Sequence, residues 1–256
     1  MVFLNSLNSC IKQSDRYPAP QAIVEGYVSP GKGVSIKITQ EIVAGAIDTL
    51  MPLEDLIVQI DVNRIAYTLS YTGKGIYANP NIIIREGDTC RLHFGYNGTE
   101  VTAFTHVPTR PTGFTGSSLT VKYKSWSQIV APELLEFKWN NPDVDYHTVI
   151  IKCIEPENNR QIIVNNHLIY GKEKHNNFTA PTLDNKVSIP TFENFFWLGR
   201  HQVILYHILP EYAILFNETD NSSQNLISAP TNINNGHGIF TGVSTSDTLL
   251  LTVSYF

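Results

Sequence analysis

Residues 90–106, which read CRLHFGYNGTEVTAFTH, decide the fold. Before Asn97-Gly98, apolar residues alternate with polar ones, which is the spacing of a strand with one buried face. An Asn-Gly pair favours a tight hairpin, because both central residues of a type I′ turn need a positive φ. The sequence therefore predicts an antiparallel hairpin whose inward-facing residues are Cys90, Leu92 and Phe94.

The same alternation recurs at residues 34–39, 56–60 and 65–70, and residues 61–64 have the composition of a turn between the last two. Seven or so short strands at residues 22–110 predict an antiparallel β-sandwich. A stretch rich in Pro, Gly, Thr and Ser follows, and it predicts a linker at residues 111–118.

A second β-domain is expected at residues 119–256. Trp139 ends one alternating run, an Asn-Pro turn follows, and Tyr146 opens the next run, an arrangement that resembles a fibronectin type III domain. Apolar residues at helical spacing after Pro210 predict one short helix, because proline suits the first turn of a helix. The predicted fold class is all-β, with two tandem antiparallel sandwiches.

Composition excludes some functions. The net charge of the 256 residues is −5 and no block of Lys or Arg occurs, which argues against a nucleic-acid ligand. Of the three cysteines, Cys90 and Cys153 alternate with apolar neighbours in separate predicted domains. We expect them to be buried free thiols.

The remaining cysteine lies in Leu7-Asn8-Ser9-Cys10, which has the spacing of a bacterial lipoprotein processing site. On this interpretation residues 1–21 are a signal remnant, the processing site and a polar tether, and Cys10 carries the lipid that holds the protein at the outer membrane. Only nine residues precede Cys10, with no basic start, whereas a working signal has about 7–15 apolar residues after a charged start. Either the true start lies upstream of Met1, or Cys10 is accidental.

Several short motifs follow one another in the order of a known family. They are IVEGYV at residues 23–28, GIY at 75–77, REGDTCRL at 85–92, THVP at 105–108 and a Gly-rich segment ending in Phe at 230–240. In this order they resemble the family catalogued as domain of unknown function 4249. The resemblance implies a transthyretin- or Ig-like sandwich followed by a fibronectin type III-like one, in an outer-membrane lipoprotein of Gram-negative bacteria. It also implies a TonB-dependent outer-membrane transporter as a possible partner, and it brings no catalytic residues.

Two segments are candidate contacts for a ligand or partner. The aromatic run Phe195-Phe196-Trp197 is either an exposed patch or core packing, with two of its three rings favoured for the core because successive residues of a strand face opposite ways. The loop Gly236-His237-Gly238 could offer backbone N–H groups to an anion. A turn that needs backbone conformations open only to glycine explains these residues better.

Catalytic and metal sites are not indicated. The histidines lack the close spacing of a zinc site, and His201 and His207 on one strand lie too far apart to share a metal. Acidic pairs lie in turn-like contexts, and no Gly-x-Ser-x-Gly motif occurs. No cofactor is expected.

These observations predict a non-enzymatic, lipid-anchored binding or accessory module for a TonB-dependent transporter or its substrate. One alternative is a structural subunit of the fimbrial or adhesin type that donates the alternating strand at residues 249–255 to a neighbour. A surface hydrolase is a third reading.

Overall fold

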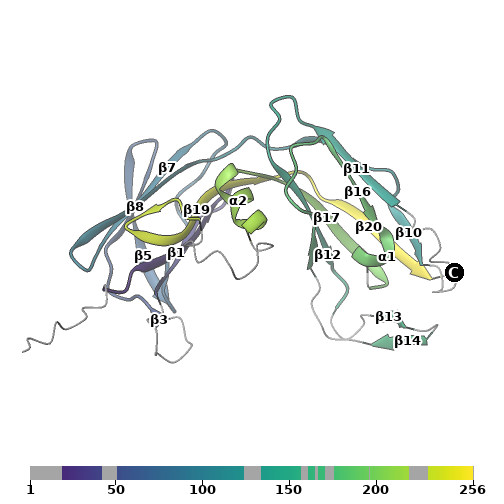
Figure 1. The fold of residues 1–256 in the computed structure, drawn as a ribbon, viewed down its shortest axis with the longest axis horizontal. Coiled ribbons are helices and arrows are strands. Elements are labelled where there is room, and N and C mark those ends of the chain that lie inside the picture. Colours follow the sequence, from purple (N-terminus) through teal and green to yellow (C-terminus); the bar gives the residue numbers. More distant parts are fainter. Residues whose placement is uncertain are drawn as a thin grey trace, which may run out of the picture.

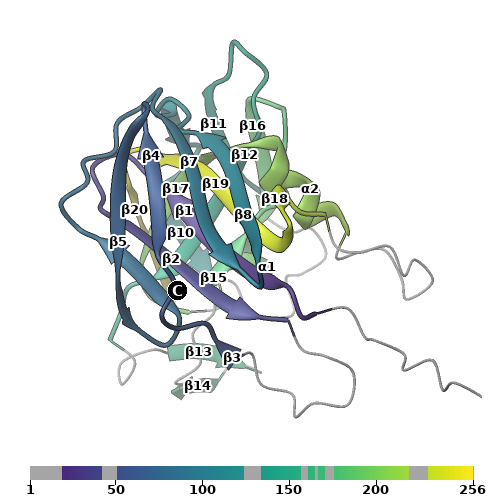
Figure 2. The same ribbon diagram turned by 90° about the vertical axis from the view of Figure 1, so that its left-hand side faces the viewer.

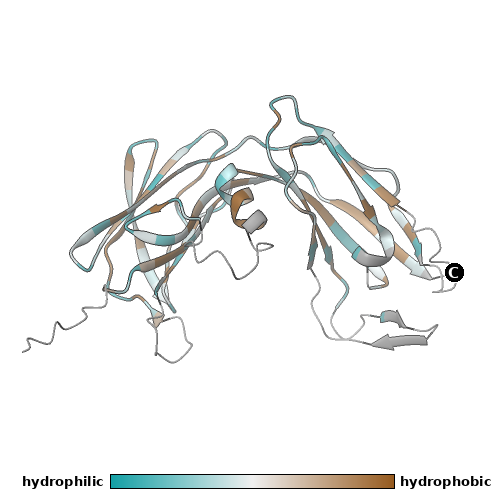
Figure 3. Ribbon diagram, in the orientation of Figure 1, coloured by the Kyte–Doolittle hydropathy of each residue, from teal (hydrophilic) through white to brown (hydrophobic). Residues whose placement is uncertain are grey.

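The structure is a computed structural model that describes residues 19–41, 51–123, 134–156, 161–164, 167–170, 176–195, 197–218 and 230–255. The described chain is all-β, as predicted, and it forms two β-sandwiches that meet like the two sides of an arch (Figure 1). Each sandwich has its own hydrophobic core. Strands that alternate between apolar and polar residues build both, as the colouring by hydropathy shows (Figure 3).

The N-terminal sandwich consists of two sheets that share one long strand, β5. Its strands follow the order β1-β2-β6-β5-β4-β7-β8, and every pair in this series is antiparallel. The strands are β1 (Ala22–Val28), β2 (Val34–Gln40), β4 (Val58–Val62), β5 (Ile65–Gly73), β6 (Ile76–Asn79), β7 (Thr89–Tyr96) and β8 (Thr99–His106), with the short β3 (Met51–Pro52) beside β2.

Both predicted hairpins are confirmed. Asn97 and Gly98 join β7 to β8 with φ values of 48° and 75°, as a type I′ turn requires. Asn63 and Arg64 join β4 to β5 in the same way, with φ values of 50° and 71°. The inward-facing residues of β7 are buried, so this hairpin sets the register of the core.

The last part of the chain closes the N-terminal sandwich. The strand β18 (Ile233–Asn234) pairs with β8, and after a turn at Asn235 the strand β19 (Gly236–Thr245) pairs with β1 (Figure 2). The β1–β19 pair is parallel, with Ala22 opposite Gly236, whereas the sequence predicted antiparallel sheets only. Ile233 and Phe240 lie in the N-terminal core. This sandwich therefore contains residues 230–242 in addition to the predicted 22–110.

The C-terminal sandwich packs a five-stranded sheet against a three-stranded one. The larger sheet follows the order β10-β20-β17-β12-β15. Its strands are β10 (Thr120–Tyr123), β12 (His147–Cys153), β15 (Asn176–Phe178), β17 (Gly199–Ile208) and β20 (Leu249–Tyr255). The smaller sheet contains β9 (Thr112–Gly116), β11 (Leu134–Asn140) and β16 (Lys186–Pro190), and a separate hairpin is formed by β13 (Gln161–Val164) and β14 (His167–Tyr170).

Three details differ from the sequence-based expectation. The predicted linker at residues 111–118 contains the strand β9, because Phe114 stacks on Phe137 at a ring distance of 5.7 Å and ties this segment to the second core. A second helix, α1 (Thr191–Asn194), accompanies the predicted one, which is α2 (Pro210–Glu218). The strand proposed as a donor, β20, pairs with β17 on one side and β10 on the other, so both of its edges are used within the fold.

One strand joins the two sandwiches. After pairing with β1 as far as Gly242, β19 continues to pair with β17 through residues 243–245. The sheets of the two sandwiches are thereby one continuous surface, β2-β1-β19-β17-β12, which forms the concave side of the arch (Figure 1).

Candidate functional site: a pocket between the two sandwiches

The concave side of the arch is formed by the strand residues that do not face the cores. On β1, Val24 and Val28 are buried, and the intervening Tyr27 points the other way with 40% of its surface exposed. On β17, Val203 and Leu205 lie in the core, so Tyr206 faces the concave side. Strand alternation thus places outward residues from both sandwiches on one surface.

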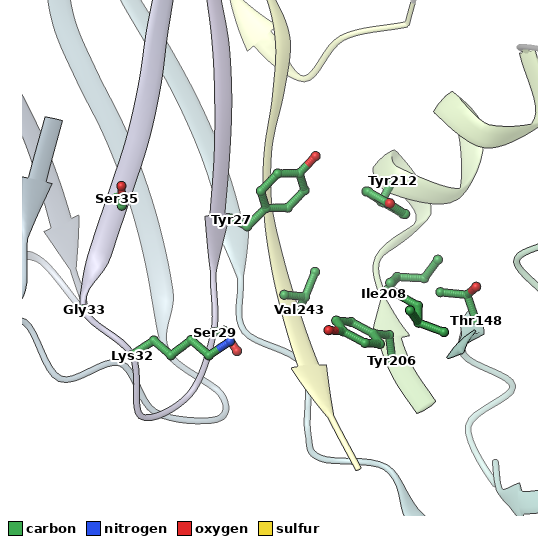
Figure 4. Close-up of a pocket in the computed structure, with 11 residues that line it drawn as sticks. Tyr27, Ser29, Lys32, Gly33, Ser35, Thr148, Tyr206, Ile208, Tyr212 and Val243 are labelled. Atoms are coloured by element: carbon green, nitrogen blue, oxygen red, sulfur yellow. The ribbon is translucent and has the colours of Figure 1, made fainter. Parts of the chain in front are cut away.

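A pocket of about 360 Å³ opens on this surface where the sandwiches meet (Figure 4). The N-terminal sandwich contributes Tyr27, Ser29, Lys32, Gly33 and Ser35. The C-terminal sandwich and the helix that follows it contribute Thr148, Ile150, Tyr206, Ile208 and Tyr212. Val243, on the strand shared by the two sandwiches, forms its floor between them.

Three tyrosines dominate the pocket wall. The rings of Tyr27 and Tyr212 meet edge to face, with their centroids 6.1 Å apart. Burial, together with Tyr212 and Glu25, raises the pKa of Tyr27 to about 12, and burial with Tyr212 also raises the pKa of Tyr206. Both phenols therefore stay protonated near neutral pH and can donate hydrogen bonds. Within the described residues, none of the three hydroxyls has a hydrogen-bond partner.

Lys32 supplies the one charged group among the lining residues. It lies in the turn between β1 and β2, which is held by a bond from Gly31 N to Ile84 O (3.0 Å) and by one from Lys32 N to Ser29 O (3.3 Å). The side chain ends beside Ser29 and points toward the side of the pocket that carries Tyr206 (Figure 4). No carboxylate in the described part of the chain lies within ion-pair distance of its ammonium group.

The helix α2 is fixed against the shared strand by hydrogen bonds to a partly buried carboxylate. Glu211 accepts hydrogen bonds from the hydroxyls of Thr105 (3.2 Å) and Thr241 (3.0 Å), one on β8 and the other on β19. These bonds hold the helix that carries Tyr212 against the N-terminal sandwich, although α2 directly follows β17 of the other sandwich. The pocket wall is therefore braced from both sides.

The segment that links the sandwiches is also held in place. The carbonyl oxygen of Thr109 accepts hydrogen bonds from His207 Nδ1 (2.8 Å) and Ser244 Oγ (2.6 Å). Arg110 donates from Nε to the carbonyl of Thr245 (2.9 Å) and pairs with Asp247 (2.9 Å). The two sandwiches are thus connected by a clamped linker as well as by a shared strand.

A histidine pair lies beside this linker and was not predicted from the sequence. His147 on β12 is opposite His207 on β17, and their rings stack with centroids 4.8 Å apart. His207 Nε2 lies 3.3 Å from a carboxylate oxygen of Asp145, and the ring of Trp139 lies 5.6 Å from that of His147, measured between centroids. Burial, reinforced by the neighbouring His207, lowers the pKa of His147 to about 4. Sixty residues separate the two histidines in the chain, so only the strand register brings them together.

The aromatic run proposed as a contact does not form an exposed patch. Phe195 is fully buried in the C-terminal core and Trp197 is 4% exposed, so these two side chains are not available to a partner. Phe196 lies outside the described residues. The burial of Phe195 and Trp197 agrees with the alternative that two of the three rings pack in the core.

The segment Gly236-His237-Gly238 is part of a strand and not a ligand loop. Its backbone pairs with Ala22, Ile23 and Val24 of β1. Gly238 has a φ of 98°, and a Cβ atom there would overlap the carbonyl oxygen of Val24. Its glycines therefore allow two strands to approach each other closely. The turn with a positive φ lies at Asn235, just before this segment.

The remaining residues considered from the sequence are either buried or outside the described part of the chain. Cys90 and Cys153 are buried free thiols, as expected. His201 and His207 are both buried on the core side of β17. Within the described residues, no group of three or more His, Cys, Asp and Glu side chains is arranged to hold a metal ion, and no helix is long and apolar enough to span a membrane. Cys10 lies outside the described residues.

The pocket residues were missed because each belongs to an ordinary alternating strand. Tyr27 and Tyr206 lie more than 170 positions apart, each on the face of its strand that points away from the core. Each ring alone carries no signal, because single exposed apolar side chains are common, and only their gathering into one patch indicates a binding surface. The pairing of β19 with β1, which brings the two faces together, has no local signal.

Comparison with known proteins does not assign the chain to a family. No protein-family model matches the sequence, and no curated protein matches it. Among solved structures, the chain is similar to the FN1–FN3 domains of chicken CNTN1, with 10% identity and a TM-score of 0.27 over 74% of this chain and 60% of that chain. It is also similar to domains A168–A170 of titin (11% identity, TM-score 0.25, 92% of this chain and 67% of that one). A third similar structure belongs to a 1.5-MDa bacterial ice-binding adhesin (10% identity, TM-score 0.22, 93% and 67%).

The chain spans 60% of the length of the CNTN1 chain that it matches. At these TM-scores the chains do not superpose as wholes. The all-β sandwich fold is therefore defined by the strands and the two cores of this protein itself.

Proposed function

We propose that this protein is a non-enzymatic binding module whose recognition surface is the concave side of the arch, with the pocket between the sandwiches at its centre. The observation that carries the proposal is that both sandwiches and the strand they share contribute to one pocket. Its volume lies at the small end of the range of about 300–1,000 Å³ typical of ligand sites. Its wall is largely apolar with a few polar groups, which is also typical of such sites.

The chemistry of the lining supports binding over catalysis. The lining residues include no His, Asp, Glu or Cys, which are the side chains that most often serve as general acids, general bases or nucleophiles. Ser29 and Ser35 lie in the wall, but no histidine or carboxylate is among the lining residues to activate a hydroxyl. What the wall offers is unused hydrogen-bond donors, one cation and apolar surface.

The finer part of the proposal concerns the setting. We place the module at the outer membrane through a lipid on Cys10, with a TonB-dependent transporter or that transporter's substrate as its partner. The support is the processing-site spacing at residues 7–10, the polar tether after it and the family resemblance of the motifs. The alternative of a polymerising subunit receives no support from β20, because both edges of that strand are paired.

Affinity purification from detergent-solubilised membranes of the native host tests the partner. We expect the wild-type protein to recover a TonB-dependent transporter and Val243→Trp to lose it, because the indole would fill the pocket without entering either core. Lys37→Gln is the matched control, since Lys37 is exposed on β2 but does not line the pocket. Equal recovery with Val243→Trp would remove the pocket from the proposal, and recovery of no transporter would remove the partner.

The anchor is tested separately by intact-mass analysis of the membrane fraction. The expected result is an acylated species that disappears in Cys10→Ala. A protein that is unmodified and partitions into the aqueous phase would contradict the anchor while leaving the pocket intact.

A further inference from the structure

The pocket has a polar end made by one residue from each sandwich. Lys32 reaches in from the turn between β1 and β2, and the hydroxyl of Tyr206 points toward it from β17 (Figure 4). One group is a cation and the other is a hydrogen-bond donor, because burial and the nearby Tyr212 raise the pKa of Tyr206 and keep its phenol protonated. Neither has a partner among the described residues.

Two converging donors favour an anion. An ammonium group and a protonated phenol can both donate to the same carboxylate or sulfonate, and hydrogen bonds to a charged acceptor are roughly twice as strong as neutral ones. No carboxylate side chain lines the pocket to neutralise Lys32. The polar end is therefore complementary in charge to a ligand that is negative at one end.

The remainder of the pocket is suited to an apolar, flat group. Val243 and Ile208 form an aliphatic floor, and the rings of Tyr27 and Tyr212 stand beside it (Figure 4). Aromatic rings of this kind prefer edge-to-face or offset contacts with another ring. The edge-to-face pair of Tyr27 and Tyr212 shows that the wall already has that geometry.

We infer that the pocket binds a small organic anion, an aromatic or similarly flat apolar body with one carboxylate or sulfonate group. The anionic group lies between Lys32 Nζ and Tyr206 Oη, and the body lies on Val243 beside the ring of Tyr27. This inference deepens the proposed function and rests on it, because it assigns a ligand class to the same pocket. Since the two polar residues belong to different sandwiches, the ligand also bridges them.

A pair of fluorescent dyes that differ in charge tests the ligand class. Anilinonaphthalene sulfonate is a flat aromatic anion, and N-phenylnaphthylamine is its uncharged counterpart. Titration of each dye into the full chain gives a dissociation constant for the wild type and for the variants Lys32→Gln, Tyr206→Phe and Val243→Trp. Lys37→Gln again serves as the matched control for the loss of one positive charge from the same region.

Lys32→Gln is expected to weaken sulfonate binding about tenfold, the size of one hydrogen bond to a charged group, while the affinity for the naphthylamine stays the same. Tyr206→Phe should weaken sulfonate binding about threefold to tenfold by removing only the hydroxyl. Val243→Trp should abolish the binding of both dyes, and Lys37→Gln should change neither.

Different failures point to different errors. If both dyes bind equally well and Lys32→Gln affects neither, the pocket takes a neutral apolar ligand and the inference of an anion is wrong, whereas the proposed pocket stands. If Val243→Trp leaves dye binding unchanged, or if neither dye binds the wild type, both the inference and the pocket of the proposed function are overturned.

Discussion

Gly238 lies at a position where the fold requires a glycine. It has a positive φ, which other residues rarely adopt, and its α-carbon faces the backbone of Val24 on the neighbouring parallel strand. Any side chain at residue 238 would push β19 away from β1. The glycine is therefore needed for the contact that joins the end of the chain to its beginning.

Replacing this glycine should be costly. Gly238→Ala is expected to lower the free energy of unfolding by about 3 kcal/mol or more, through backbone strain and loss of the close strand contact. Gly95→Ala is the matched control, because Gly95 lies in β7 with an ordinary φ and open space around its α-carbon. Urea titrations compare the two variants, and equal stabilities would contradict the role assigned to Gly238.

His147 is a residue whose charge state is controlled by the fold. Its folded pKa of about 4 lies below the usual value of 6.5, so between these values the unfolded chain takes up a proton that the folded chain does not. The free energy of unfolding should therefore fall as the pH drops from 6.5 to 4, by about 2–3 kcal/mol in total. Asp145 and His207 are the titratable groups that face it.

The variant His147→Asn tests this dependence. Asparagine can keep the hydrogen bond that His147 Nδ1 makes to the carbonyl of Asp145 (3.0 Å), but it does not titrate. We expect the decrease in stability between pH 6.5 and 4 to become markedly shallower, as measured by thermal unfolding at a series of pH values. His106→Asn, at an exposed position of β8, should leave the slope as it is in the wild type. An unchanged slope in His147→Asn would show that another group is responsible.

At the scale of elements, local signals predicted the strands with clear alternation but not the pairing between distant strands. The Asn97-Gly98 turn and the alternation in β7 are properties of adjacent residues, and the structure confirms them. The pairing of β19 with β1 and that of His147 with His207 depend on register between distant segments. The strand β9 within the predicted linker at residues 111–118 was missed for a related reason. The Gly, Thr and Ser residues around Phe114 are typical of a loop, and only the stacking of Phe114 on Phe137 in the second core ties the segment to the sandwich.

The predicted boundary of the first domain leads to a test by fragments. Residues 19–110 alone lack Phe240, and β1 and β8 would each have an exposed edge. We expect this fragment to aggregate or to lack a cooperative unfolding transition, because unpaired edges and a missing core side chain both destabilise it. A peptide with residues 230–246, added in trans, should restore a monomeric fold detectable by circular dichroism and sedimentation. A stable fragment without the peptide would show that β18 and β19 are dispensable.

At the scale of the whole molecule, the shared strand makes the two sandwiches one mechanical unit. β19 is paired with β1 in its first part and with β17 in its last, and the clamped linker runs beside it. The pocket exists only while the two sandwiches keep this arrangement. We therefore expect the unfolding of one sandwich to weaken the other.

Phe240→Ala tests this coupling. Truncating a fully buried phenylalanine in the N-terminal core costs about 3–5 kcal/mol and should lower the midpoint of thermal unfolding by about 10 °C. Trp139 and Trp197 lie in the C-terminal sandwich, and the remaining Trp126 is outside the described residues. In a Trp126→Phe background the tryptophan fluorescence therefore comes from the C-terminal sandwich alone. If the sandwiches are coupled, the fluorescence midpoint falls together with the circular dichroism midpoint. A fluorescence midpoint that stays at the wild-type temperature would show independent unfolding.

β18 and β19 follow β8 by more than 100 residues, and this order has a consequence for biosynthesis. A chain emerges from the ribosome with its N-terminus first, so the edges of β1 and β8 have no partner until residues 233–245 have been made. Throughout that interval the nascent N-terminal half is an incomplete sandwich that exposes open sheet edges, a recognised route to aggregation. Synthesis of this protein therefore creates a long period in which a chaperone that binds unfolded chains has its greatest effect, and the period ends only when β18 and β19 have emerged and paired.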